Sequence, residues 1–186
     1  MFFRATWAVF RKDVQLELRS RYAINALGMF VAASLVLVLF ALGQTEISPP
    51  VRAALLWIVI LFAACVGLGR AFVAEEERGT TLLLQLHVPP SAVYAGKLLY
   101  NAALTLALNL AAAAGFLLVT GAEIAAPGVL LLTLVLGAIG LAGATTLLAA
   151  MIARASGGAP VLAALACPVL VPLLFSVCNL TERATR

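Results

Sequence analysis

Long apolar runs constrain the fold of this chain more than any other sequence feature. A helix of about 20 apolar residues spans the hydrocarbon core of a bilayer, which is about 30 Å thick. Each run is far longer than a buried strand, and the alternating pattern of a transmembrane barrel is absent. The sequence therefore predicts an all-α integral membrane protein, a single transmembrane domain over residues 1–186. The predicted spans are 22–43, 52–74, 98–120, 128–152 and 159–178.

Composition supports lipid as the solvent of this bundle. Hydrophobic residues make up 64% of the chain and charged residues only 11%, whereas a soluble domain is roughly a quarter charged. The formal net charge of +4 is better explained by membrane topology than by nucleic acid. We therefore expect membrane lipid, and no nucleic acid, among the partners.

The distribution of lysine and arginine predicts the orientation of the spans. One side of the predicted membrane carries most of them, namely Arg4, Arg11, Lys12, Arg19, Arg21, Arg70, Arg78, Lys97 and Arg154. The other side has Arg52, Arg183 and Arg186. The positive-inside rule then places the N-terminus and the 75–97 loop in the cytoplasm. Five spans leave the C-terminal tail outside.

Residues 1–21 are predicted to form a separate amphipathic helix at the cytoplasmic face. The apolar residues recur at steps of three and four, and basic or polar residues occupy most of the remaining circumference. These apolar residues are Phe3, Trp7, Phe10, Val14 and Leu18. A basic, aromatic-rich helix of this kind lies in the membrane interface. It is either a simple anchor or a lateral helix that packs against a cytoplasmic partner.

A polar stripe marks the third span. Its members follow steps of three or four residues, namely Tyr94, Lys97, Asn101, Thr105 and Asn109. Polar groups at membrane depth face protein or water rather than lipid. The stripe therefore either makes interhelical hydrogen bonds or forms a wall of a substrate path or subunit interface.

Small residues and prolines suggest how the spans pack. Three pairs have the small-xxx-small spacing that lets helix backbones approach closely: Ala63 with Gly67, Ala111 with Gly115, and Gly140 with Ala144. In the fifth span, Pro168 and Pro172 predict a kink.

The sequence offers no catalytic residues, no cofactor-binding residues and no metal ligands. The phosphate-binding pattern G-x-x-x-x-G-K-[ST] does not occur. There is one histidine, His87, and no Ser-His-acid set. All acidic residues fall in predicted loops, the tail or the N-terminal helix. We therefore expect no enzymatic activity and no energy source in this chain, so that a partner must supply any work of transport.

The segment 75–101, "EEERGTTLLLQLHVPPSAVYAGKLLYN", is more elaborate than a plain connector. Glu75, Glu76 and Glu77 stand where the second span should end, and acids at a helix C-terminus are unfavourable by about 0.3–1 kcal/mol each. They are either a solvated charge run or a contact for a basic partner surface.

A short cytoplasmic helix should follow these acids. Either Thr80 or Thr81 can cap it, Pro89 and Pro90 end it, and Ser91 can cap the third span. Its apolar ridge with an acidic neighbour suits a groove on a soluble protein. The predicted coupling contact comprises Glu75, Glu76, Glu77, Arg78, Gly79, Leu82, Leu83, Leu86, Pro89 and Pro90.

The stretch "FVAEEERGTTLLLQLHVPPSAVYAGKLLYN" resembles the segment between the second and third spans of the heme exporter protein B (CcmB) family. "FRKDVQLELRSR" and "ASGGAPVLAALACPVLVPLLF" are similar as well. The resemblance implies an ABC-2-type permease-like fold in the bacterial cytoplasmic (inner) membrane and a role in c-type cytochrome biogenesis. It also implies that a partner ATPase docks on the short cytoplasmic helix, flanked by the acids 75–77.

The resemblance also implies partners and cargo. The partners are an ABC ATPase subunit (CcmA-type), a heme-handling membrane subunit (CcmC-type), a small membrane subunit (CcmD-type) and a periplasmic heme chaperone (CcmE-type). No cofactor is expected on this chain; ATP binds the partner subunit, and heme is a substrate of the complex. The alternatives are a permease of this architecture for a drug, lipid or polysaccharide, and a non-transporting membrane scaffold. The family has six spans, so a sixth span is either truncated or missing here.

Overall fold

The computed structural model describes residues 2–42, 48–68, 88–121, 124–152 and 158–185. All regular elements within these ranges are α-helices, which confirms the predicted all-α fold. They are α1 (Phe2–Ser20), α2 (Tyr22–Leu42), α3 (Pro49–Leu68), α6 (Pro90–Thr120), α7 (Pro127–Ile152) and α8 (Gly158–Ala184).

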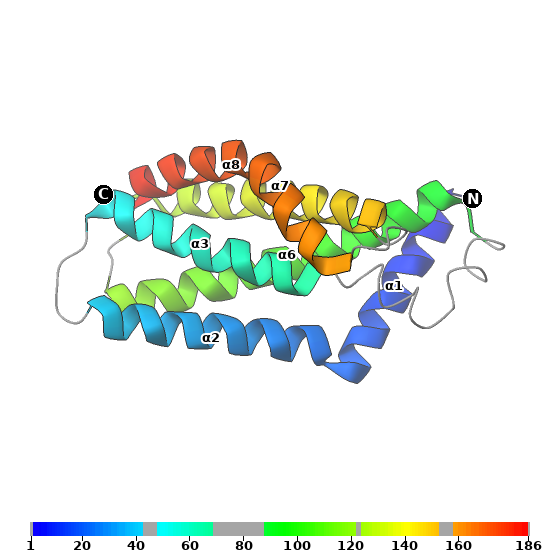
Figure 1. The fold of residues 1–186 in the computed structure, drawn as a ribbon, viewed down its shortest axis with the longest axis horizontal. Helices are drawn as coiled ribbons and strands as arrows, with labels where there is room; N and C mark the ends of the chain where they lie inside the picture. The colour runs from blue at the N-terminus through cyan, green and yellow to red at the C-terminus, as the bar shows by residue number, and fades with distance from the viewer. Residues whose placement is uncertain (1, 43–47, 69–87, 122–123, 153–157, 186) are drawn as a thin grey trace.

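The long helices form an elongated bundle. In Figure 1, α2, α3, α6, α7 and α8 run along the long axis, and α1 crosses one end obliquely. The N-terminus lies at the end with α1 and the C-terminus at the opposite end. The five long helices and the opposite positions of the two termini fit five antiparallel passes through a membrane. In α8 the helix axis changes direction partway along its length, as the two prolines predict (Figure 1).

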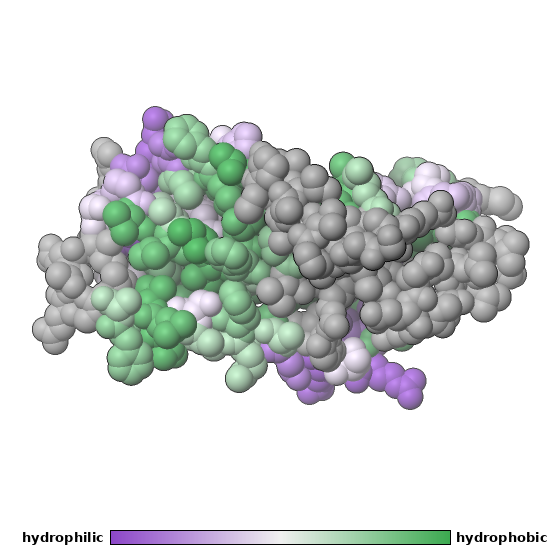
Figure 2. Space-filling model, viewed as in Figure 1, coloured by the Kyte–Doolittle hydropathy of each residue, from purple (hydrophilic) through white to green (hydrophobic). Residues whose placement is uncertain are grey.

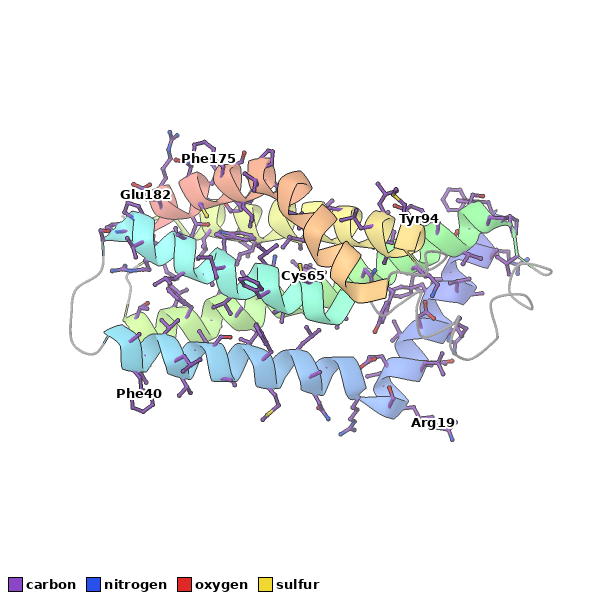
Figure 3. The ribbon with its side chains drawn as sticks, in the orientation of Figure 1. Arg19, Phe40, Cys65, Tyr94, Phe175 and Glu182 are labelled. Atoms are coloured by element: carbon purple, nitrogen blue, oxygen red, sulfur yellow. The ribbon has the colours of Figure 1, made fainter. Side chains whose placement is uncertain are left out.

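Length and hydropathy support a membrane location. Within the described residues, three helical segments are long and apolar enough to cross a bilayer: Ile24–Ala41, Pro90–Thr120 and Pro127–Met151. A shorter apolar helix covers Pro49–Cys65. The outward surface carries large apolar side chains; Phe40 and Phe175, which are 80% and 72% exposed, point away from the bundle (Figure 3). Figure 2 shows apolar residues over much of the described surface on one face. Such a surface is stable only in lipid or against a partner.

The start of α6 differs from the sequence prediction. The helix begins at Pro90 instead of residue 98, so part of the predicted 75–97 loop is helical. Pro89 is the N-cap residue and no side chain caps the helix, so the prediction that Ser91 is the cap is wrong. Proline suits the first helical position because its φ is already helical and its missing N–H would have no partner there.

The core lies among α3, α6, α7 and α8. Trp57 on α3 is 1% exposed, and its indole Nε1 donates a hydrogen bond of 2.8 Å to the Thr181 hydroxyl on α8. The ring fits because Gly137 on α7 has no side chain, and a Cβ there would overlap the indole. This contact fixes three helices against one another.

The small-residue pairs are only partly used as predicted. A Cβ on Gly115 would meet Leu35 of α2 at 2.6 Å, and one on Gly140 would meet Leu173 of α8 at 2.7 Å. Ala111, in contrast, is exposed. The surroundings of Gly67 lie outside the described residues.

Candidate coupling site

The predicted coupling contact falls mainly in residues 69–87, outside the described part of the chain. The members of the contact in this range are Glu75, Glu76, Glu77, Arg78, Gly79, Leu82, Leu83 and Leu86. Thr80, Thr81 and His87 also lie in this range. Pro89 and Pro90 are described and start α6. The coupling role of all these residues stays a prediction. The described residues that flank them form a site of their own, between α1 and the start of α6.

Helix α1 packs closely against α6. Val9 is 3% exposed, and a Cβ added to Gly96 would lie 2.7 Å from the Val9 Cβ and 2.9 Å from the Thr6 carbonyl oxygen. Only glycine at residue 96 allows the two backbones to come so near. The amphipathic helix predicted over residues 1–21 is therefore an integral part of the bundle at this point.

The apolar residues predicted for the membrane face of α1 point away from α6. Phe3, Trp7 and Leu18 are 85%, 60% and 60% exposed, and the Trp7 and Phe10 rings lie 5.1 Å apart. This surface is free to contact lipid, as the sequence predicts. The sequence did not predict the face that packs on α6, where Thr6, Val9 and Asp13 are separated by steps of three and four.

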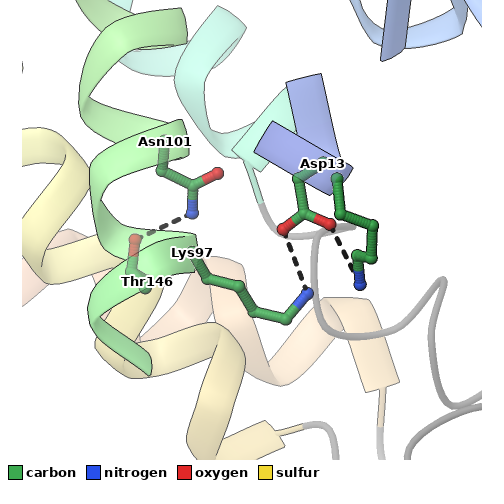
Figure 4. A network of polar contacts seen from close by, with 5 residues as sticks. Asp13, Lys97, Asn101 and Thr146 are labelled. Carbon is green, nitrogen blue, oxygen red and sulfur yellow. Dashed lines mark hydrogen bonds and ion pairs between the residues drawn. The ribbon is translucent and has the colours of Figure 1, made fainter. Parts of the chain in front are cut away.

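A charged pair joins the two helices. Lys97 Nζ lies 3.7 Å from Asp13 Oδ2, and Lys12 Nζ lies 3.2 Å from Asp13 Oδ1 (Figure 4). The Lys97 side chain is only 1% exposed and that of Asp13 only 11%. Removing an ion from water costs several kcal/mol unless an opposite charge and hydrogen bonds compensate. Asp13 therefore allows a lysine to be buried near the start of a membrane-spanning helix.

Glu17 extends this contact by one turn of α1. Its Oε1 accepts a hydrogen bond of 2.9 Å from the backbone N–H of Ile24, in the first turns of α2. Its carboxylate also lies near the Tyr100 side chain on α6. Between α1 and α2, Arg21 adopts a left-handed φ of 51°, which turns the chain sharply. Glu17 thus bonds α1 to α2 and lies beside α6.

The predicted polar stripe of α6 faces the inside of the bundle over most of its length. Lys97, Asn101, Thr105 and Asn109 are 0–1% exposed, whereas Tyr94 is half-buried. Polar side chains turn inward because lipid offers no hydrogen-bond partner. The prediction that the stripe forms a wall of a substrate path or subunit interface remains untested.

Two asparagines connect α6 with α7. Asn101 Nδ2 donates to the Thr146 hydroxyl at 2.8 Å (Figure 4), and Asn109 Nδ2 donates to the Leu134 carbonyl at 3.0 Å. Thr105 donates to the Asn101 carbonyl within α6. The stripe therefore makes interhelical hydrogen bonds, which is one of the two roles predicted for it from the sequence. Together with the Asp13–Lys97 pair, they form a polar connection from α1 through α6 to α7.

The described residues contain no group of three or more histidines, cysteines, aspartates and glutamates placed to hold a metal ion. Cys65 and Cys178 are not part of a disulfide. The chemistry visible in this part of the chain is therefore ion pairing and hydrogen bonding between helices.

Comparison with known proteins identifies the family. The sequence profile of the CcmB protein family matches residues 4–186, nearly the whole chain. The chain belongs to the CcmB family. CcmB proteins are permease subunits of the heme exporter of cytochrome c maturation, in a complex with an ATPase and other Ccm subunits. As a CcmB permease subunit, the chain is a transporter component and not itself an enzyme. No curated protein and no solved structure matches it.

Proposed function

We propose that this CcmB-family chain couples ATP hydrolysis by a CcmA-type subunit to loading or release of heme on a periplasmic CcmE-type chaperone. The observation that carries the proposal is the gathering of α1 and the start of α6 at one end of the bundle (Figure 1). Helix α6 begins at this end, at Pro90 (Figure 1). An ATPase that grips the 75–90 segment would therefore act directly on α6.

Orientation supports the same proposal. The basic residues of α1 and Lys97 lie toward this end, which the positive-inside rule assigns to the cytoplasm. ATP is available only on that side, so the cytoplasmic end is where an ATPase must bind. The CcmC-type and CcmD-type subunits would complete the complex within the bacterial inner membrane.

The chain's part in this process would be mechanical. The only histidine, His87, lies outside every predicted span, so no imidazole is available to ligate heme iron within the bundle. We propose that ATP binds the CcmA-type subunit, that heme is a substrate of the complex, and that this chain transmits conformational change.

The test is co-purification of the CcmA-type subunit with a triple variant, Glu75→Lys, Glu76→Lys and Glu77→Lys. We expect the ATPase to be lost from the purified membrane complex, because repulsion would replace attraction at its basic surface. Glu123→Lys, in a predicted outer loop, is the matched control and should retain the ATPase. Retention of the ATPase by the triple variant would contradict the proposed contact.

A second measurement separates coupling from scaffolding. In the purified wild-type complex, heme transfer to the chaperone should depend on ATP. A complex that assembles normally and transfers heme equally well without ATP would identify the chain as a scaffold that only holds other subunits.

A further inference from the structure

We propose that α1 and the start of α6 (residues 90–101) move as one rigid lever, with Asp13 and Lys97 as the positioning residues that hold them together. This inference rests on the proposed function, because it concerns how work applied at the cytoplasmic end enters the bundle. Under this proposal, α1 does not only anchor the protein in the membrane. It also transmits that work.

The first argument is steric. Val9 and the Thr6 carbonyl lie so close to Gly96 that a single added carbon would collide with both. A contact with no room for a methyl group leaves no room for sliding, since closely packed surfaces resist small displacements. Helix α1 therefore cannot roll over α6 without first separating from it.

The second argument is electrostatic. Separation of α1 from α6 would remove Asp13 from Lys97, whose side chain is 1% exposed. In an environment of low dielectric, a buried ammonium group that loses a neighbouring carboxylate is destabilised. The neighbouring Lys12, 3.2 Å from Asp13, would not replace the missing negative charge. The pair thus opposes separation more strongly than an exposed salt bridge would.

The third argument is connectivity. Glu17 bonds the other half of α1 to Ile24 on α2, and its carboxylate lies near Tyr100 on α6. One turn beyond Lys97, Asn101 bonds to Thr146 on α7. A displacement of α1 would therefore reach three spanning helices through contacts that are all within the described residues. A helix that only anchored the protein in the interface would need none of these polar contacts.

Charge exchange tests the positioning role. In the reconstituted complex, Asp13→Asn should leave the CcmA-type subunit bound but reduce the heme transferred per ATP hydrolysed at least tenfold. The double exchange Asp13→Lys with Lys97→Asp should restore at least half of the wild-type ratio. A ratio unchanged in Asp13→Asn, or a double exchange no better than Asp13→Asn, would overturn the proposal.

A disulfide lock tests the same inference without removing the charges. The three native cysteines are first replaced by alanine, and Val9→Cys is combined with Gly96→Cys. Their Cβ atoms would be near enough for a disulfide after a displacement of roughly 1 Å. We expect the oxidised protein to retain at least half the heme transfer of its own reduced form. Loss of transfer on oxidation, reversed by a reductant, would show that α1 must leave α6 during the cycle.

The lever and the proposed function fail in different ways. If the lever is wrong, Asp13→Asn transfers heme normally while the 75–77 charge reversal still removes the ATPase. If the proposed function is wrong, the 75–77 reversal retains the ATPase, and heme transfer does not depend on ATP in any variant.

Discussion

Gly96→Ala is the substitution whose effect can be worked out most directly from the structure. The added methyl would lie 2.7 Å from Val9 Cβ, 2.8 Å from Val9 Cγ1 and 2.9 Å from the Thr6 carbonyl oxygen. Ordinary carbon contacts begin near 3.4 Å, so α1 would have to withdraw by roughly 0.7 Å. The obstructing atoms belong to the backbone and a β-branched side chain, which cannot rotate away.

Two opposing terms set the magnitude. Overpacking of this kind costs about 1–3 kcal/mol, while alanine is favoured over glycine in a helix interior by about 1 kcal/mol. The matched control is Gly143→Ala on α7, where a Cβ would meet nothing within 4 Å. Gly143→Ala gains only the stabilisation that comes from the higher helix propensity of alanine. We therefore expect Gly96→Ala to be less stable than Gly143→Ala by about 1–3 kcal/mol.

The free energy of unfolding can be measured by SDS titration in mixed micelles, followed by far-UV circular dichroism. Gly96→Val should lose more than Gly96→Ala, since it adds two further methyl groups in the same gap. Equal stability of Gly96→Ala and Gly143→Ala would refute the close packing of α1 on α6.

Further substitutions test the rest of the bundle. Trp57→Phe should destabilise it by about 1–3 kcal/mol, because it removes the hydrogen bond to Thr181 and leaves space in the core; unfolding in SDS measures this, and a stability equal to wild type would contradict the contact. A double-mutant cycle of Asn101→Leu and Thr146→Val should give a coupling free energy of about 0.6 kcal/mol, as for other interhelical hydrogen bonds in membranes; a coupling of zero would exclude the bond. Gly140→Ala should cost less than Gly96→Ala, because the atoms in its way are the flexible tips of one leucine, and the reverse order of melting temperatures would count against this packing.

The fold was predictable because the membrane imposes a length on each helix. Apolar runs predicted helices at 22–43 and 128–152, and the structure has them at Tyr22–Leu42 and Pro127–Ile152. The start of α6 was not found by the same criterion, since its first turns contain polar and charged residues. The signal for it was local: Pro90 has the backbone angle of a first helical residue.

The inward orientation of the α6 stripe was also predictable, because polar atoms cannot face lipid. The partner of Lys97 was not. The sequence prediction placed Asp13 and Glu17 only in the N-terminal helix, although their steps of three and four residues with Thr6 and Val9 put them on one side of α1. Likewise, nothing in the sequence pairs Trp57 with Gly137, because a glycine accommodates a distant ring only once the helices are packed.

The most direct test of the whole account is the amount of heme delivered to the chaperone with and without ATP, measured in proteoliposomes that contain the complete complex. With wild-type chain, the account predicts delivery that requires ATP, and with the charge-reversed 75–77 chain it predicts delivery at the level seen without ATP. Equal ATP-dependent delivery by both chains would contradict it.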